Sequence, residues 1–236
     1  SVVTPNTENN LVHGVKWYAD GNEKSTAAMV MVHGSFAPSF AAEKLLAKPL
    51  LKNDIHVFAL AAPYHMDRMP GNSAFSGQYL LSGDIPRLIG GLVQCVADYR
   101  ALIKYLKSTG YTKIFIEGIS MGGTIALLVM VLEKINGGYL LMPAVDFYNV
   151  FNQAPMAKAI RQSALKAGWQ QETLKKAFQC IKPGELGFPK TETSKIELHY
   201  GKYDMQVRPL TIEKFIRQWR GIQSYDYQRG HRTMGL

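Results

Sequence analysis

The sequence contains few cysteines. Only Cys95 and Cys180 occur in 236 residues, and neither belongs to a C-x-x-C pair. Two isolated cysteines exclude a zinc site of the C-x-x-C type and a small domain held together by many disulfides. We therefore expect two free, buried thiols, with one disulfide between them as the alternative. We also expect no metal site.

Long apolar runs are also missing. The longest run, 124–132, is about half as long as the roughly 20 residues that a membrane-crossing helix needs. We therefore expect no stable insertion into a membrane and a cytoplasmic location. Because the chain begins with Ser1 and not with methionine, a removed signal peptide is the alternative.

The basic residues do not form clusters. The formal net charge is +9, but lysine and arginine are scattered and form no basic block or basic strand interleaved with aromatic residues. Such strands are typical of RNA-binding modules. The charge therefore predicts a solvated basic surface and no nucleic-acid partner. Weak attraction to anionic membranes or substrates is the alternative.

Strand-like and helix-like patterns alternate along most of the chain. This alternation predicts the α/β fold class, with an open, mostly parallel twisted sheet and helices on both faces. The expected strands are 11–19, 28–33, 55–60, 113–117, 139–142, 196–200 and 223–228. The expected helices are 40–51, 84–107, 120–134 and 209–219.

The region 143–190 interrupts this alternation. It is rich in Ala, Lys and Gln, has partly helical spacing and carries no strand signal. We interpret it as a helical lid inserted into an α/β core made of 1–142 and 191–236, and an ordinary pair of surface helices is the alternative.

The loop 61–83 is rich in Pro, Gly, Ser and Met, and loops of this length are usually functional or disordered.

The motif Gly118-Ile119-Ser120-Met121-Gly122 matches G-x-S-x-G. It follows an expected strand and opens an apolar helix, which is the context that a nucleophile elbow needs. The tight turn would force Ser120 into a strained backbone conformation, and glycine two residues before and after it avoids collision. We therefore predict Ser120 as a nucleophile, and a helix-capping serine is the alternative.

A serine nucleophile needs a base and an acid that orients the base. His231 follows the last expected strand, so it lies at the sheet end where catalytic groups gather in open α/β sheets. Asp204 lies between Ser120 and His231 in the chain and just past the strand 196–200, so we predict it as the acid. Asp146, after the preceding strand, is the competing candidate.

Two backbone N–H groups should stabilise the negative charge of a tetrahedral intermediate. Met121, directly after the predicted nucleophile, should supply one. The second should come from the loop after 28–33, where Ser35 is the first choice and Phe36 the second. His33 in this loop is expected to be a structural residue that fixes the loop, and a catalytic base is the alternative.

Four motifs together resemble the α/β-hydrolase superfamily in their order and spacing: VHGSF (32–36), GISMGG (118–123), GKYD (201–204) and GH (230–231). The resemblance implies hydrolysis of carboxylic esters or thioesters through an acyl-enzyme, without a cofactor or metal. The alternatives are an acyltransferase, an amidase or a carbon–carbon hydrolase with the same three residues. A ligand-binding protein of this fold with little turnover is a further alternative.

The segment PYHMDRMP (63–70) resembles a loop that borders the active-site mouth in esterase-like members. The resemblance makes His65 and Arg68 candidate substrate contacts. Phe36 and Phe147 are two further candidates. The alternative is that His65 and Arg68 pin the long loop to the scaffold. The expected partner is a small acyl ester with a partly hydrophobic acyl group, and the sequence indicates no oligomeric state.

Overall fold

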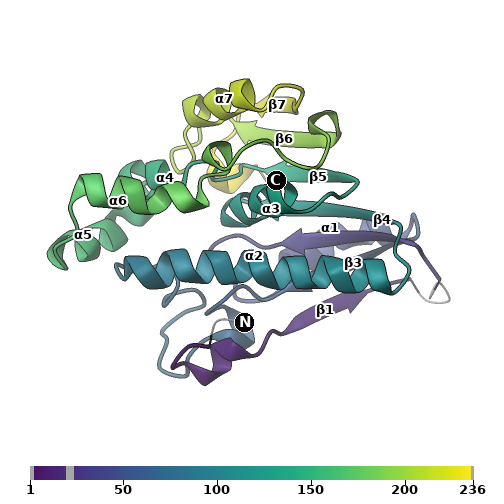
Figure 1. Cartoon of the computed structure of the whole chain (residues 1–236), viewed down its shortest axis with the longest axis horizontal. Coiled ribbons are helices and arrows are strands. Elements are labelled where there is room, and N and C mark those ends of the chain that lie inside the picture. Colours follow the sequence, from purple (N-terminus) through teal and green to yellow (C-terminus); the bar gives the residue numbers. More distant parts are fainter. Residues whose placement is uncertain (1–2, 20–23, 235–236) are drawn as a thin grey trace.

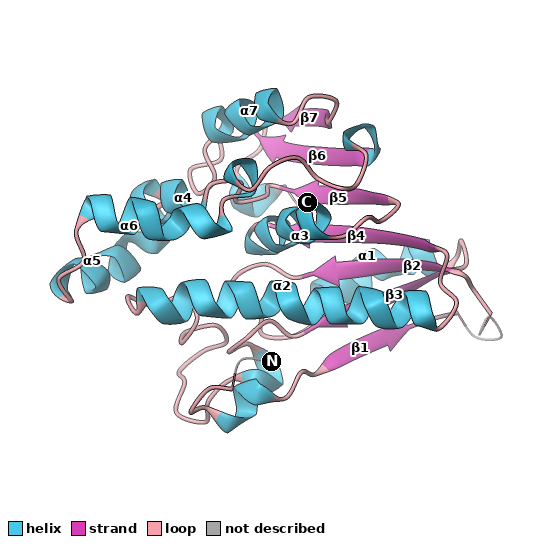
Figure 2. Ribbon diagram, in the orientation of Figure 1, coloured by secondary structure: helices cyan, strands magenta, loops and turns pink. Residues whose placement is uncertain are grey.

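A single sheet forms the centre of the molecule (Figures 1 and 2). The computed structural model describes residues 3–19 and 24–234, and within them seven strands follow the order β1-β3-β2-β4-β5-β6-β7. β1 is antiparallel to β3, and the other neighbouring pairs are parallel. The strands are β1 (Gly14–Trp17), β2 (Ala27–Val32), β3 (Ile55–Leu60), β4 (Lys113–Ile119), β5 (Gly137–Leu141), β6 (Ile196–Gly201) and β7 (Gln223–Tyr227).

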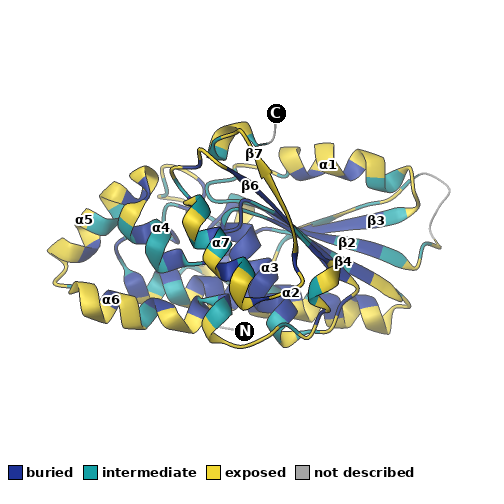
Figure 3. Cartoon of the chain, turned by 90° about the horizontal axis from the view of Figure 1, so that it is seen from above, coloured by how far each residue is buried: buried dark blue, intermediate teal, exposed yellow. Residues whose placement is uncertain are grey.

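Helices cover both faces of this sheet (Figure 3). α1 (Ala41–Leu51) packs on one face, against a small apolar cluster that includes Met31 and Val57. The larger core lies on the other face, and its helices are α2 (Ile85–Ser108), α3 (Met121–Leu132) and α7 (Pro209–Gln218). The predicted fold class is therefore confirmed.

α3 runs through the middle of the larger core. Residues 121–130 of this helix are all buried, because α3 packs against β4 and β5 of the sheet and against α2 beside it. A helix with apolar residues on all sides must be enclosed in this way. This packing holds the N-terminus of α3, and the turn before it, in a fixed position at the carboxyl end of β4.

The strand order reverses at β2. β2 pairs with β3 on one side and with β4 on the other. Crevices outside the carboxyl ends of the strands at such a switch point are the usual ligand sites of open α/β sheets. Val32 is level with Gly118 in the parallel register, so the loop after β2 and the turn after β4 start side by side.

The region between β5 and β6 is helical, as its composition predicted. It contains α4 (Phe147–Gln153), α5 (Lys158–Lys166), α6 (Gln171–Phe178) and the short 3-10 helices η3 (Pro155–Ala157), η4 (Gln179–Ile181) and η5 (Pro183–Glu185). The three α-helices extend beyond the carboxyl ends of the strands (Figure 1). The Phe178 ring packs on the rings of Phe147 and Phe151, at centroid distances of 6.1 and 5.2 Å, and so holds α4 against α6.

The two cysteines differ in their surroundings. Both are free; Cys95 is buried, as expected, but Cys180 is exposed. The expectation of a buried Cys180 was wrong because η4 turns Ile181 into the core and leaves its neighbour facing solvent.

None of the helices that the structure describes combines the length and the apolar character that crossing a bilayer requires.

Candidate active site

Ser120 occupies a sharp turn between β4 and α3. Its backbone has a φ of 54° and a ψ of −111°, a conformation that residues with a side chain rarely adopt. A Cβ atom at Gly118 would collide with the carbonyl group of Gly122, so the turn accepts only glycine there. Ser120 N donates to Leu141 O (2.9 Å), and Ser120 O accepts from Ala144 N (3.0 Å). These bonds hold the strained residue in place.

Three polar side chains from distant parts of the chain form a continuous row of hydrogen bonds. Ser120 Oγ lies 3.0 Å from His231 Nε2, and His231 Nδ1 lies 2.6 Å from Asp204 Oδ2. The Asp204 side chain is fully buried and that of His231 is 15% exposed. The structure thus brings together the three residues that the sequence predicts as nucleophile, base and acid.

The loop after β6 determines the direction in which Asp204 points. Its Oδ1 atom accepts hydrogen bonds from the backbone N–H groups of Gln206 (2.8 Å) and Val207 (2.9 Å). With Oδ1 held by these two donors, Oδ2 faces His231. A buried carboxylate in this position can hold the imidazole with its proton on Nδ1 and leave Nε2 free to accept a proton.

Two buried histidines support the loop after β2. His33 Nδ1 donates to Gly34 O (2.8 Å) while Nε2 accepts from Ala62 N (2.9 Å). His65 Nε2 accepts from Phe36 N (3.2 Å), and Nδ1 donates to a carbonyl group two residues earlier (2.9 Å). Burial lowers the pKa of His33 to about 4 and that of His65 to about 3. Both rings are therefore neutral near pH 7, as their accepting Nε2 atoms require.

These contacts distinguish the candidate oxyanion donors. The N–H group of Phe36 donates to His65, so it is not available to a ligand. Ser35 N makes no backbone hydrogen bond within the part of the chain that the structure describes. Met121 N belongs to the first turn of α3, where N–H groups have no partner inside the helix. Ser35 and Met121 both line the cavity beside Ser120.

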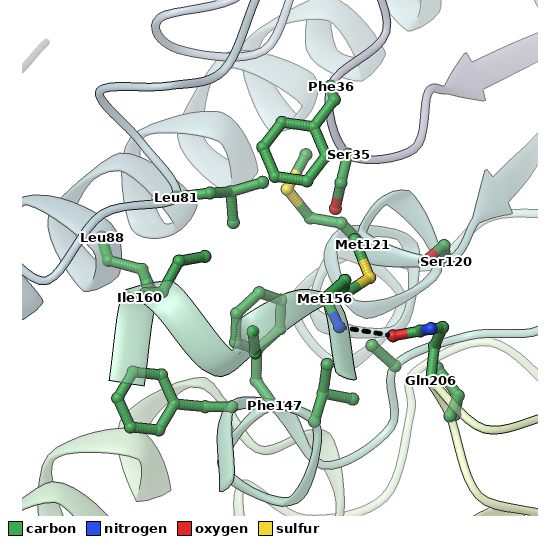
Figure 4. Close-up of a pocket in the computed structure, with 15 residues that line it drawn as sticks. Ser35, Phe36, Leu81, Leu88, Ser120, Met121, Phe147, Met156, Ile160 and Gln206 are labelled. Atoms are coloured by element: carbon green, nitrogen blue, oxygen red, sulfur yellow. Dashed lines mark hydrogen bonds between the residues drawn. The ribbon is translucent and has the colours of Figure 1, made fainter. Parts of the chain in front are cut away.

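An apolar cavity of about 490 Å³ opens beside Ser120 (Figure 4). Its walls come from the loop after β2, the long loop before α2, the start of α2 and the helical region after β5. The lining residues are Ser35, Phe36, Leu81, Leu88, Ser120, Met121, Ala144, Phe147, Val150, Phe151, Met156, Ala157, Ile160, Gln206 and Val207. A mostly apolar pocket with a few polar groups at one end is typical of small-molecule sites.

A second, more open cavity of about 840 Å³ meets the first one at Ser120. Its lining includes His231 and Arg232, neither of which lines the apolar cavity. Met156 and Gln206 line both cavities, and Met156 N donates to Gln206 Oε1 (3.2 Å; Figure 4). This hydrogen bond joins the helical region after β5 to the loop that carries Asp204.

The comparison with protein families identifies the chain. Residues 15–198, more than half of the chain, match the model of the family described as "Alpha/beta hydrolase domain containing 18". The chain belongs to this family. It is therefore a member of the α/β-hydrolase superfamily, as the four motifs indicated, and its membership supports a hydrolase activity. A comparison with curated protein sequences gives no match.

Solved structures share the fold of this α/β-hydrolase at low sequence identity. Est1E from Butyrivibrio proteoclasticus, in a structure with bound ferulic acid, is 14% identical with a TM-score of 0.68, over 93% of this chain and 87% of that one. A cold-adapted esterase from an Arctic intertidal metagenomic library is 16% identical with a TM-score of 0.62, over 93% and 80%. Pyrococcus horikoshii acylaminoacyl peptidase is 10% identical with a TM-score of 0.61, over 95% and 36%.

Asp146, the competing acid, has a different position in this α/β-hydrolase. Its Oδ1 atom caps the N-terminus of α4 by accepting from Asn149 N (2.9 Å), and Oδ2 lies 3.3 Å from Lys182 Nζ. The acid in contact with His231 is Asp204. The position of Asp204 after the strand 196–200 therefore favoured the carboxylate that the structure places beside the imidazole.

His65 and Arg68 do not line either cavity at Ser120. Both are fully buried, and the Arg68 guanidinium donates to Asn9 O (2.9 Å), Ala61 O (2.9 Å) and Asp98 Oδ2 (2.8 Å). The contacts favour the alternative that these residues pin the long loop to the scaffold. A buried side chain without a path to the cavity cannot touch substrate, so the structure does not support direct contact by either residue.

Phe36 and Phe147, the other two predicted substrate contacts, do line the apolar cavity. The sequence did not point to the aliphatic residues of the same wall, such as Leu81, Leu88 and Ile160, because apolar residues on helices and loops are indistinguishable from ordinary core. Gln206 was also missed, although its place two residues after Asp204 is a usable signal.

The described residues contain no group of three or more His, Cys, Asp or Glu side chains suited to a metal ion.

Proposed function

We propose that the chain is a serine hydrolase that cleaves carboxylic esters or thioesters through an acyl-enzyme. Ser120 is the nucleophile, His231 the base and Asp204 the acid that orients it. The observation that carries this proposal is the unbroken row from Ser120 Oγ through His231 to Asp204 Oδ2, with distances of 3.0 and 2.6 Å. A nucleophile, a base and an orienting group within hydrogen-bond reach are the signature of nucleophilic catalysis.

In the first half of the reaction, Ser120 Oγ attacks the acyl carbon while its proton moves to His231 Nε2. The charge that His231 then carries is stabilised by the ionised Asp204 at Nδ1. The acyl oxygen becomes negative and accepts hydrogen bonds from the backbone N–H groups of Ser35 and Met121. The N-terminus of α3 also favours negative charge at this position.

In the second half, His231 returns the proton to the leaving oxygen or sulfur, and the bond to the acyl carbon breaks. Water then enters, gives a proton to His231 and attacks the acyl-enzyme. The proton finally returns to Ser120 Oγ, and the free acid leaves. The cycle is balanced without any cofactor, because each proton is held by His231 between the two steps.

The apolar cavity supports an acyl group with a hydrophobic body. The helical region forms one of its walls, so we propose that 143–190 acts as a lid over the acyl group and that 1–142 and 191–236 form the core. Esterases among the similar structures favour ester cleavage, and the peptidase among them makes amide cleavage the competing activity. The fold alone does not select between these reactions.

Active-site labelling and ester hydrolysis test this proposal together. A fluorophosphonate should label the folded protein at Ser120 in a one-to-one ratio, and p-nitrophenyl esters of increasing acyl length should be turned over. Ser120→Ala should abolish labelling and lower kcat by roughly 10⁴-fold. Ser224→Ala, on the exposed strand β7, is the matched control. Labelling without ester turnover would indicate another acyl acceptor or amide substrate, and no labelling would favour a binding protein.

A further inference from the structure

The two cavities that meet at Ser120 differ in chemistry. Apart from the polar groups near Ser120, the apolar cavity is lined by aliphatic, aromatic and methionine side chains. The open cavity is lined by His231, Arg232 and Gln206 in addition to small and apolar residues. Because both include Ser35 and Ser120, a substrate whose carbonyl group is at Ser120 must extend into both.

The position of His231 decides which part of the substrate enters which cavity. In the proposed reaction, His231 Nε2 gives its proton to the leaving oxygen or sulfur, so that atom must lie against the imidazole. His231 lines the open cavity and does not line the apolar one. The leaving group therefore extends into the open cavity, and the acyl group fills the apolar cavity.

Arg232 gives the open cavity a positive charge. It is the one permanently charged side chain among the described residues that line this cavity, and no carboxylate lines it. Within the described part of the chain, Arg232 forms no salt bridge. Asp204 is fully buried, and its charged contact is with His231 and not with Arg232.

We propose that Arg232 is a specificity residue that selects substrates whose leaving group carries an oxyanion, such as a carboxylate or a phosphate, while the apolar cavity receives a neutral acyl chain. This proposal rests on the proposed acyl-enzyme function. The planar guanidinium suits two parallel hydrogen bonds to an oxyanion. Because Arg232 is exposed, water and salt weaken the contact, and we expect an effect of about fivefold on kcat/KM.

Two matched esters test the charge of the leaving group. 4-Carboxyphenyl hexanoate and 4-carbamoylphenyl hexanoate share their acyl chain and differ by a negative charge on a group of similar size. After each kcat/KM is divided by the rate of alkaline hydrolysis of the same ester, the protein should prefer the carboxylate about fivefold. The preference should shrink as the salt concentration rises.

Substitutions of Arg232 identify the source of this preference. Arg232→Gln should reduce the ratio between the two esters to about one, and Arg232→Glu should reverse it. Arg217→Gln is the matched control, since it removes the same charge from an exposed position on α7 and should keep the wild-type ratio. An unchanged ratio in Arg232→Gln, or an equal loss for both esters, would overturn the proposal.

A second pair of esters places the charge at the acyl end. The 4-nitrophenyl monoesters of adipate and of adipamate differ only by a terminal carboxylate or carboxamide, and the protein should disfavour the carboxylate. A preference for it that Arg232→Gln removes would reverse the assignment of the cavities. If Ser120 is labelled and the esters are turned over without these preferences, only the Arg232 proposal fails. If Ser120 is not labelled and no ester is cleaved, the proposed function fails with it.

Discussion

At the scale of single residues, the candidate active site depends on a strained serine and on a carboxylate whose second oxygen is kept for His231. The φ of 54° at Ser120 is tolerated because hydrogen bonds from β5 and the loop after it hold both sides of the peptide. Asp204 is fully buried, and its two oxygen atoms have separate partners. The first feature fixes the position of Ser120 Oγ, and the second fixes the orientation of the His231 ring.

Asp204→Asn tests the orientation of His231. An amide in place of the carboxylate can put an N–H group against His231 Nδ1, which favours the tautomer with its proton on Nε2 and blocks proton transfer from Ser120. We expect kcat on p-nitrophenyl esters to fall by roughly 10⁴-fold with little change in KM.

Asp146→Asn is the matched control for this experiment. Asp146 caps α4 and does not touch His231, so its replacement should leave kcat within about twofold and change the free energy of unfolding by at most about 1 kcal/mol. A larger loss of kcat in Asp146→Asn than in Asp204→Asn would show that the acid has been assigned to the wrong residue.

At the scale of elements, the helical region after β5 supplies the largest share of the apolar cavity, and the loop between β3 and α2 adds Leu81. Arg68 in η2 (Met66–Arg68) ties the loop to η1 (Thr7–Asn10) and to Asp98 of α2. Ile160 of α5 is among the residues of the helical region that line the cavity (Figure 4). The shape of the cavity therefore depends on two segments that are not adjacent in sequence.

Ile160→Trp should shorten the preferred acyl chain. The larger side chain would fill part of the apolar cavity while leaving Ser120, His231 and Asp204 in place. In a series of p-nitrophenyl esters, we expect kcat/KM for long chains to fall at least tenfold and that for acetate to change by less than about twofold, since a lost methylene contact in a pocket is worth about 1–3 kcal/mol. Equal losses across the series would contradict the placement of the acyl group.

Arg68→Gln should reduce stability without changing substrate binding. Removing one partner of a buried ion pair typically costs about 3–5 kcal/mol, because the other charge stays buried. We expect a loss of about 3 kcal/mol in urea unfolding and an unchanged KM for p-nitrophenyl esters. Arg100→Gln, which breaks an exposed pair with Glu133 (2.8 Å), should cost less than about 1 kcal/mol. A raised KM without lost stability would restore Arg68 as a substrate contact.

At the scale of the whole molecule, buried titratable groups change the stability in opposite directions as the pH varies. Burial lowers the pKa of His33 and His65 to about 4 and about 3. Burial raises the pKa of Glu117 to about 7, and the nearby Glu43 adds to this increase. The histidines therefore resist protonation in the folded state, while Glu117 resists ionisation.

The effect of Glu117 on stability can be measured from its pH dependence. In the unfolded chain the histidines bind protons below about pH 6.5, so they reduce stability as the pH falls from there towards 4 and below. Glu117 acts in the opposite direction between pH 7 and 4.5, where only the folded state keeps its proton. The two histidines together outweigh Glu117, so wild-type stability should fall moderately in this window and more steeply just below it, where Glu117 no longer opposes them.

Glu117→Gln removes the opposing contribution. We expect the free energy of unfolding of this variant to decrease by about 3 kcal/mol more than that of the wild type between pH 7 and pH 4.5, since one pKa unit is worth about 1.4 kcal/mol. Urea unfolding at pH 7.5, 6.0 and 4.5 measures this difference. Parallel pH profiles for the two proteins would contradict the raised pKa of Glu117.

Local spacing in the sequence was enough to predict the strands, the main helices and the elbow at Ser120. Short apolar runs specify buried strands, and a G-x-S-x-G between a strand and a helix specifies a turn, because both depend on neighbouring residues. Chain order after the strands also pointed to Asp204 and His231, since the carboxyl ends of parallel strands meet at one edge.

Only the tertiary structure decided which side chains face the substrate. His65 and Arg68 lie in a loop that follows a strand, as Ser35 does, yet packing against η1 and α2 buries Arg68, and the buried His65 ring accepts a hydrogen bond from the N–H group of Phe36. The apolar cavity likewise joins Leu88 of α2 to Ile160 of α5. Burial and contacts between distant segments depend on how whole elements pack, and no local pattern records that packing.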